Sequence, residues 1–150
     1  MPEIKEIAAA ATFPVRHPVL RPGKAIDTCR FDGDELVTTK HFGLYVAHTL
    51  VAVISIFESK SKFFAEDRQF QIRGMAVLEA YRKQRLGEQL VAHVEKYVGG
   101  QQGELIWFNA RETAVGFYKK LGYAIIGDPF NIEDIGSHYT MFKNLTSHRL

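Results

Sequence analysis

Apolar residues along the chain gather into short runs separated by polar or glycine-rich stretches, a pattern typical of strands joined by loops. The runs predict strands at residues 4–7, 42–47, 50–57, 70–77, 104–108, 123–126 and 139–142. Only His48 and Thr49 separate the second run from the third, so we expect these two strands to form an antiparallel hairpin with a tight turn. A polar loop is expected over residues 58–68.

Two other segments repeat their apolar residues at helical spacing, which predicts amphipathic helices. The apolar positions are Leu86, Leu90, Val94 and Val98 in the first segment and Ala114, Phe117 and Leu121 in the second. We expect the first helix to end at the glycine pair 99–100, and the second to end with Gly122 as a left-handed cap. Residues 8–20 also have helical character, which Pro14 and Pro18 must interrupt or restart.

A hairpin followed by alternating strands and helices predicts the fold class. We expect an α/β fold (α+β) in which helices flank a mixed, mostly antiparallel twisted sheet of about six to seven strands. The chain has 150 residues and shows no internal repeat and no linker-like stretch, so we expect one domain over residues 1–150.

Composition narrows the class of protein. With 46% hydrophobic and 24% charged residues the chain is an ordinary globular one, and a net charge of +2 is too small to predict a nucleic-acid partner. The longest apolar run, residues 50–57, is far shorter than a membrane span, and no secretory signal is visible at the start. The single cysteine, Cys29, excludes an internal disulfide and suits a reducing compartment. We therefore expect a cytoplasmic protein that binds neither membranes nor nucleic acid.

Candidate chemistry is concentrated where the strand at 70–77 runs through a short polar turn into the helix that follows. The first amide groups of a helix have no partner inside it, and the helix dipole favours negative charge there. Arg82, Lys83 and Arg85 place three cations within four residues, and Gly87 lets a bulky anion approach the backbone. The pattern indicates a phosphate-binding turn, and its alternative is a solvated basic helix start that binds nothing.

The segment Arg82-Lys83-Gln84-Arg85-Leu86-Gly87 resembles the signature of the GNAT superfamily of N-acetyltransferases, a turn of pattern Gln/Arg-x-x-Gly-x-Gly/Ala. It matches the first and last fixed positions and has Arg85 where the pattern has its middle glycine. A side chain there is compatible with an ordinary helical conformation, so we expect the turn to persist, with a narrower approach for a phosphate. The resemblance implies that the backbone amides of residues 82–88 hold the pyrophosphate of acetyl-coenzyme A and that residues 75–77 hydrogen-bond its pantetheine arm as an extra strand would.

A second motif supports the same family. Residues 109–123, from Asn109 through Phe117-Tyr118 to Leu121-Gly122-Tyr123, resemble the helix of these enzymes that ends in Phe-Tyr-x-x-Leu-Gly-Phe/Tyr. The resemblance spans residues 42–145 and assigns protonation of the leaving thiolate to Tyr118, whose alternative is a core aromatic residue. The cofactor-binding residues that it implies are Met75, Ala76, Val77, Arg82, Lys83, Gln84, Arg85, Leu86, Gly87, Glu88, Asn109 and Phe117.

The sequence also bears on the attack by the amine. Many members of this family have a glutamate base on the strand at 70–77, but the matching position here is Gln71, or nearby Arg73, and neither can act as a base. We therefore expect direct attack with proton removal through ordered water. Glu79 and His138 are the alternative bases, and the backbone N–H of Val77 is the expected donor to the oxyanion.

The remaining reactive residue types have plainer interpretations. The six histidines show no metal-ligand spacing, so no metal is expected; they are His17, His41, His48, His93, His138 and His148. A buried structural thiol is expected at Cys29. Asp32, Asp34 and Glu35 predict an exposed acidic loop, with a ring around an amine pocket as the alternative.

Two other functions stay open. One is a non-catalytic sensor that binds acetyl-coenzyme A and regulates a partner. The other is a phosphate- or nucleic-acid-binding module, which the acidic residues scattered through the chain weaken. The acceptor is not determined: small amines, aminoglycosides, amino acids and peptide or protein lysines all fit. A homodimer is also compatible with the sequence.

Overall fold

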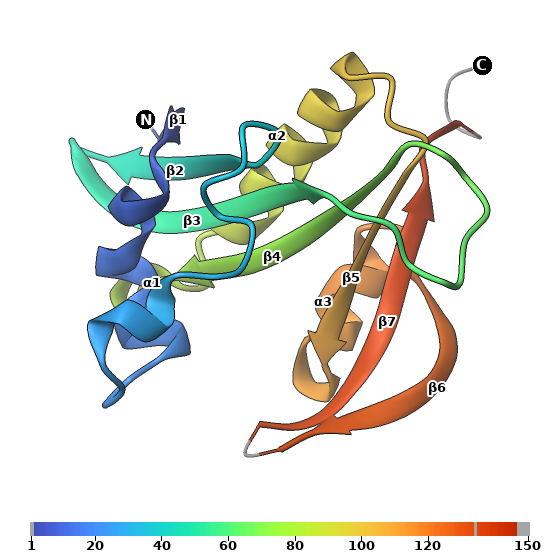
Figure 1. Ribbon diagram of the computed structural model, residues 1–150. Coiled ribbons are helices and arrows are strands. Elements are labelled where there is room, and N and C mark those ends of the chain that lie inside the picture. Colours follow the sequence, from blue (N-terminus) through green and yellow to red (C-terminus); the bar gives the residue numbers. More distant parts are fainter. Residues whose placement is uncertain (1, 134, 147–150) are drawn as a thin grey trace. The chain divides into compact units, whose positions relative to one another are not determined.

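The computed structural model describes residues 2–133 and 135–146, and its strands form one sheet (Figure 1). Seven strands of the described residues lie in the order β1-β2-β3-β4-β5-β7-β6. Their bounds are β1 (Glu3–Ile7), β2 (Lys40–Val46), β3 (Thr49–Glu58), β4 (Gln69–Val77), β5 (Leu105–Arg111), β6 (Ala124–Ile132) and β7 (Gly136–Asn144). The helices are α1 (Phe13–Leu20), α2 (Leu86–Gly100) and α3 (Val115–Lys120), with short 3-10 helices η1 (Ala9–Thr12), η2 (Ile26–Cys29), η3 (Glu79–Tyr81) and η4 (Glu112–Ala114).

The pairing of these strands confirms the predicted mixed, mostly antiparallel α/β sheet. Antiparallel pairs join β1 to β2, β2 to β3, β5 to β7 and β6 to β7. The pairing of β4 with β5 is parallel and runs from Gln69↔Leu105 to Gln71↔Trp107. The chain divides into two compact units, one made of residues 1–57 and 72–97 and the other of residues 58–71 and 98–150.

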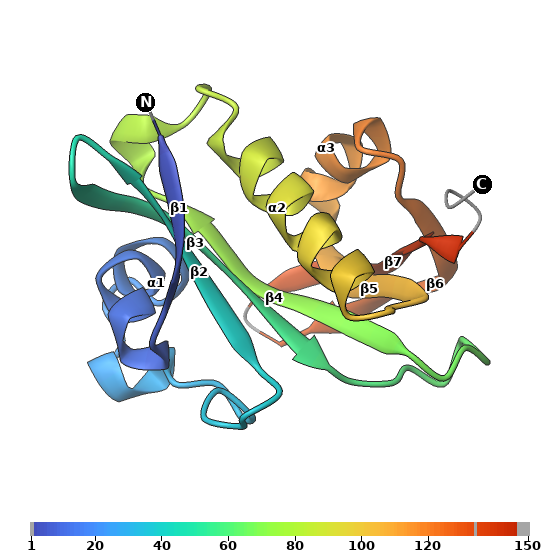
Figure 2. The same ribbon diagram turned by 90° about the horizontal axis from the view of Figure 1, so that it is seen from above.

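In the first unit, the side chains of each strand alternate between two faces of the sheet, and each face is covered by a helix. On one face Val15 of α1 packs with Val53 of β3 and Ala76 of β4. On the other face the ring of Phe42 in β2 lies 4.7 Å from that of His93 in α2. Figure 2 shows α1 and α2 on opposite sides of these strands.

One glycine in β4 changes this alternation. Gly74 has φ +67°, and a Cβ there would lie 2.8 Å from the ring of Phe31. Arg73, just before it, contacts Phe31, while Ala76 packs on Val15 of α1. Because residues three apart now share the α1 face, β4 carries an irregularity of the β-bulge kind, which re-aims side chains.

In the second unit, α3 packs through an aromatic cluster on β5. The ring of Tyr118 lies 4.3 Å from that of Phe108, and the ring of Tyr123 lies 5.0 Å from it. The N–H of Tyr123 donates to the carbonyl of Tyr118 at 3.1 Å and that of Gly122 to Lys119 at 3.1 Å, with φ of Gly122 at +97°. This is the Schellman arrangement, which confirms the predicted left-handed cap.

The predicted hairpin turn is displaced by one residue. The hairpin turn consists of Ala47 and His48, not His48 and Thr49, and both have positive φ, 49° and 68°, as a two-residue hairpin turn requires. Helix α2 ends at Gly100, which confirms the predicted stop at the glycine pair 99–100. Just beyond this end Gln102 takes the left-handed conformation with φ 62°, and the N–H of Gly103 donates to the carbonyl of Val98 at 2.9 Å.

Strand β6 is longer than predicted because its pairing with β7 resumes after a shift in register. The strand is predicted over residues 123–126, but β6 continues to Ile132. Its pairing with β7 shifts between Ile126 and Phe130, and Gly127 has φ 77°. Pro18 likewise does not end α1, whose first turn holds Pro14. None of the helices among the described residues has the length and apolar character needed to cross a membrane.

Candidate functional site

The turn between β4 and α2 has the backbone geometry of an anion-binding concavity. After Val77 the chain forms η3, passes through residues 82–85 and enters α2 at Leu86. Lys83 and Arg85 both have left-handed backbone conformations, with φ 66° and 61°. Left-handed residues alternating with ordinary ones turn successive N–H groups toward one point, as in the nests that bind phosphates.

The hydrogen bonds of the turn show which amides are available. The N–H of Arg82 donates to the carbonyl of Glu79 at 3.3 Å, so this amide already has a partner in this conformation. The N–H of Gln89 donates to the carbonyl of Arg85 at 3.3 Å and begins the helical pattern. The amides of Leu86, Gly87 and Glu88 therefore precede the first helical bond and have no partner within the helix.

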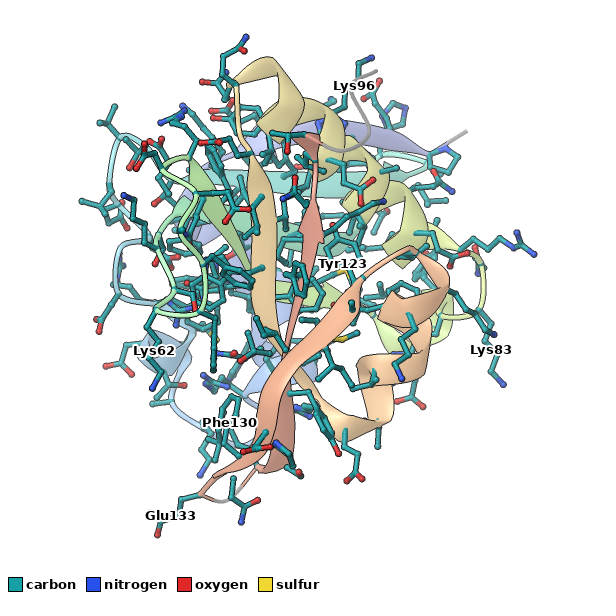
Figure 3. All side chains as sticks on the ribbon, turned by 90° about the vertical axis from the view of Figure 1, so that its right-hand side faces the viewer. Lys62, Lys83, Lys96, Tyr123, Phe130 and Glu133 are labelled. Carbon is teal, nitrogen blue, oxygen red and sulfur yellow. The ribbon has the colours of Figure 1, made fainter. Side chains whose placement is uncertain are left out.

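The cations of the turn are held loosely. Arg82, Lys83, Gln84 and Arg85 are exposed, and the side chain of Lys83 extends away from the ribbon (Figure 3). The Nε of Arg82 donates to the carbonyl of Val77 at 3.2 Å, which joins the turn to the end of β4. Within residues 2–133 and 135–146, none of the three cations forms an ion pair, so their charge is available to a ligand.

The conformation of Arg85 corrects the sequence-based expectation. A side chain at this position is compatible with an ordinary helical conformation, but φ 61° places Arg85 in the left-handed region. A residue other than glycine in the left-handed region destabilises the folded state by about 1–3 kcal/mol. The glycine of the family pattern is thus replaced by a strained arginine, and the turn keeps the shape that the glycine would allow.

Arg85→Gly is therefore expected to stabilise the protein. Relief of strain exceeds the added flexibility of glycine in the unfolded chain, about 0.5–1 kcal/mol, so we expect a net gain of about 1 kcal/mol and a rise in Tm of about 2–4 °C. Differential scanning calorimetry checks this. The matched control is Arg82→Gly, because Arg82 has an ordinary φ of −69° and should lose stability. Equal losses of stability in Arg85→Gly and Arg82→Gly would contradict the inference that the backbone of Arg85 is strained.

The segment Met75–Val77 follows the irregularity at Gly74. It lies beyond Gln71, where the parallel pairing of β4 with β5 ends. Ala76 is buried in the core with Val15, and its neighbours are half-buried. The carbonyl of Val77 accepts from Arg82. A strand segment outside that pairing fits the role of an edge to which an extended ligand could add.

Tyr118 combines a buried ring with an available hydroxyl. The residue is 8% exposed, and its ring packs against Phe108, Phe117 and Tyr123. Burial raises the pKa of Tyr118 to about 12, so the phenol stays protonated throughout the physiological range. Among the described residues none forms a hydrogen bond with its hydroxyl. The alternative of a core aromatic is correct for the ring, and the hydroxyl is left as a donor.

Phe117 and Asn109, which the second motif also implies, have different surroundings. The ring of Phe117 is half-buried and meets that of Tyr118 edge-on, with centroids 5.0 Å apart. Asn109 of β5 accepts a hydrogen bond of 2.9 Å from the hydroxyl of Thr140, which leaves its amide NH₂ group free to donate.

The structure distinguishes the two alternative bases. Glu79 is an exposed residue at the start of η3. His138 of β7 is buried, and its Nδ1 lies 2.9 Å from the carbonyl of Gly136. Because a carbonyl can only accept, Nδ1 donates in this hydrogen bond, which leaves Nε2 as the other ring nitrogen.

The acidic loop prediction is wrong for one residue. Asp34 is 3% exposed and accepts hydrogen bonds of 2.6 and 3.2 Å from the guanidinium of Arg16 in α1, which is fully buried. Arg16 also donates to Ser55 at 2.9 Å. A buried charge requires a partner. The spacing of apolar residues in the sequence does not indicate that Arg16 and Asp34, which are 18 residues apart, form an ion pair. This ion pair fixes the segment after α1 to the sheet.

Cys29 lies beside this pair. Its side chain is fully buried, and its carbonyl accepts from Arg16 at 2.8 Å. Burial raises the pKa of the thiol, which confirms the prediction of a structural cysteine. In the described part of the chain no group of three or more histidine, cysteine or carboxylate side chains could hold a metal ion, and His148 lies outside that part.

Comparison with known proteins places this fold and turn in one class. A model of the acetyltransferase (GNAT) domain matches residues 39–125. The Bacillus subtilis protein YitI, described as an uncharacterized N-acetyltransferase, is 35% identical over 149 residues, which cover 99% of this chain and 100% of YitI.

Solved structures share the fold at low identity. An aminoglycoside 6'-N-acetyltransferase complexed with coenzyme A is 16% identical, with a TM-score of 0.76 over 95% of this chain and 97% of the other. The ribosomal-protein-S18-alanine N-acetyltransferase of Escherichia coli is 16% identical, with a TM-score of 0.75 over 96% of this chain and 94% of the other.

These matches define the protein as an acetyltransferase enzyme. The chain belongs to the GNAT family of N-acetyltransferases.

Proposed function

We propose that this enzyme moves an acetyl group from acetyl-coenzyme A to a primary amine by direct attack. The observation that carries the proposal is the turn at residues 83–88, where two left-handed residues precede three helix amides outside the helical pattern. Such a turn suits a pyrophosphate. Coenzyme A supplies the acetyl group as a thioester, and the edge of β4 at residues 75–77 supports an extended arm.

The reaction needs a neutral amine and a proton donor at sulfur. The amine nitrogen bonds to the thioester carbonyl carbon, the carbon–sulfur bond breaks, the nitrogen loses a proton and the sulfur gains one. We propose ordered water as the first acceptor of the nitrogen proton, with His138 Nε2 as the side chain best prepared to take it. The backbone N–H of Val77 is the proposed donor to the oxyanion.

Tyr118 is the proposed donor to the leaving sulfur. A phenol of pKa about 12 is a much weaker acid than a thiol of pKa about 8.5. Complete proton transfer from Tyr118 to the thiolate is therefore uphill. The hydroxyl acts chiefly as a hydrogen-bond donor that stabilises the charge on sulfur as the bond breaks, and solvent completes the protonation.

Thiol release tests the proposed function. Purified protein is incubated with acetyl-coenzyme A and a panel of amines, and free thiol and acetylated amine are quantified together. We expect equal amounts of both with at least one acceptor. The rate should rise with pH, because the neutral fraction of an amine with a pKa near 10.4 grows about tenfold per pH unit below it.

The same assay discriminates the second candidate function, an acetyl-coenzyme A sensor. Binding of acetyl-coenzyme A without thiol release from any amine would favour the sensor and contradict the enzyme. We further propose that the enzyme has a single domain and acts on a small-molecule or peptide amine. A cytosolic location completes the proposal, because the single buried cysteine suits a reducing compartment.

A further inference from the structure

Arg73 of β4 lies half-buried against the segment that follows α1. Its guanidinium carbon is 5.1 Å from the ring centroid of Phe31 and 5.2 Å from that of Phe57, so two aromatic rings flank it. Its Nη1 donates one hydrogen bond of 3.3 Å to the main-chain carbonyl of Asp32. A guanidinium has five N–H donors in a rigid fork, so most of those of Arg73 remain for a ligand.

The charge of Arg73 has no partner among the described residues. None of their carboxylates lies within ion-pair distance of it, and Asp34 is already bonded twice by Arg16. Burial lowers the pKa of Arg73, with Asp34 opposing that effect and Arg16 adding to it. A desolvated cation without an anion is unfavourable, and an arriving anion would recover that cost.

The surroundings of Phe31 carry an excess of positive charge. Three guanidinium carbons lie around its ring, that of Arg16 at 3.9 Å, that of Arg73 at 5.1 Å and that of Arg21 at 5.6 Å. The carboxylates that act on Arg73 are those of Asp34 and Asp32. Asp34 is paired with Arg16, while neither Arg73 nor Arg21 forms an ion pair among the described residues, so this surface can accept a further negative group.

Arg73 is also placed at a useful distance along β4. A strand advances about 3.3 Å per residue, so the backbone of Arg73 lies within roughly 7–13 Å of Met75 to Val77, the proposed edge for the pantetheine arm. A small bifunctional molecule can span that distance. The cation of Arg73 repels the acceptor's amine when that amine is protonated. An anion elsewhere on the acceptor is attracted to Arg73 and offsets this repulsion.

We infer that Arg73, flanked by Phe31 and Phe57, binds an oxyanion of the acceptor, so that the acceptor is an amine carrying a carboxylate or phosphate a few bonds from its nitrogen. The inference rests on the proposed function and narrows its substrate class. Amino acids and amino phosphates fit this description. Simple polyamines do not.

The test compares acceptors that differ only in the anion. The probes are glycine, β-alanine and 4-aminobutyrate, each against the amino alcohol of the same length, with phosphoethanolamine to distinguish phosphate from carboxylate. We expect kcat/KM about 10- to 100-fold higher for the best anionic probe than for its alcohol, the range expected for a charge-assisted hydrogen bond. Arg73→Met should reduce this ratio to within about threefold, chiefly by slowing the anionic probe, and Arg73→Lys should fall between.

The matched control is Arg30→Met. Arg30 belongs to the same segment but is exposed, already paired with Glu35, and 5.7 Å from the ring of Phe13. It should leave the ratio unchanged, and the coenzyme-induced rise in Tm should persist in all three variants. A ratio near one in the wild type, or a ratio that Arg73→Met leaves intact, would overturn the inference while acetylation of both probes upholds the proposed function.

A second readout does not depend on turnover. Protein saturated with coenzyme A is titrated with N-acetylglycine, N-acetylethanolamine or O-phosphoethanolamine while Tm is followed. Stabilisation by an anionic probe alone, lost in Arg73→Met, supports the inference even if no amine is acetylated and the proposed function fails. No difference between anionic and neutral probes contradicts it.

Discussion

Tyr118→Phe is expected to lower kcat by about 100- to 10,000-fold, the usual contribution of an acid or hydrogen-bond donor in the transition state. The phenylalanine ring keeps the packing against Phe108 and Phe117 and removes only the hydroxyl. Stability and coenzyme affinity should therefore change little. Since the contact with sulfur strengthens as the bond breaks, kcat and kcat/KM should fall together.

Steady-state kinetics with the best acceptor measure this effect, and Tyr123→Phe is the control. Tyr123 belongs to the same cluster, 5.0 Å from Phe108, but has no proposed role at sulfur. Its variant should keep turnover within about threefold of the wild type, the spread expected of a substitution outside the transition state. If Tyr118→Phe kept full activity, the hydroxyl of Tyr118 would have no role in catalysis and the residue would be purely structural.

The raised pKa of Tyr118 adds a pH signature. Because the phenol loses its proton only near pH 12 in the folded protein, Tyr118 contributes no loss of activity with rising pH below about pH 11. The buried neutral form also favours folding below the ordinary tyrosine pKa of about 10, and that contribution is lost as pH rises from about 10 to 12.

Gly87→Glu is expected to abolish the stabilisation that acetyl-coenzyme A gives to the wild type. At a concentration 100 times Kd a ligand stabilises by about 2.7 kcal/mol, which corresponds to a rise in Tm of about 5–10 °C for a chain of this size. A carboxylate in the first turn of α2 would occupy the space of the pyrophosphate and repel it. The variant should fold, because the helix dipole favours a glutamate there.

Thermal denaturation with and without acetyl-coenzyme A measures this effect, and Gly100→Glu is the control. Gly100 lies at the other end of α2, and a Cβ there would meet no atom within 4 Å. It should keep the full ligand-induced shift. If acetyl-coenzyme A raised the Tm of Gly87→Glu as much as that of the wild type, the pyrophosphate would have to bind elsewhere on the chain.

Periodicity in the sequence predicts the strands and the helices, because each of them buries one repeating set of side chains. It fails where backbone conformation decides. The left-handed conformations of Lys83 and Arg85, and the continuation of β6 through Gly127, are backbone features that the spacing of apolar side chains does not encode. Glycine is the usual sign of a positive φ, and an arginine in its place gives no such signal.

The candidate site is predicted in part. The motif at residues 82–87 locates the turn, but it does not reveal that the amide of Arg82 is already bonded. Arg73 is read from the sequence only as a residue that cannot be a base. That Arg73 has no ion-pair partner among the described residues becomes visible only in the structure, where Asp34 is bound to Arg16, 18 residues earlier in the chain than Asp34.

The buried pair of Arg16 and Asp34 also governs how the segment after α1 moves. Opening this segment would leave a charge inside the protein without its partner, at a cost of about 3–5 kcal/mol. The N–H of Phe31 donates to the carboxylate of Asp34 at 2.9 Å, so the ring that flanks Arg73 is held by the same group. Small fluctuations therefore do not reshape this surface. The acceptor therefore binds to a surface that is already formed. Discrimination between acceptors occurs when they first bind, not when the site closes in a later step.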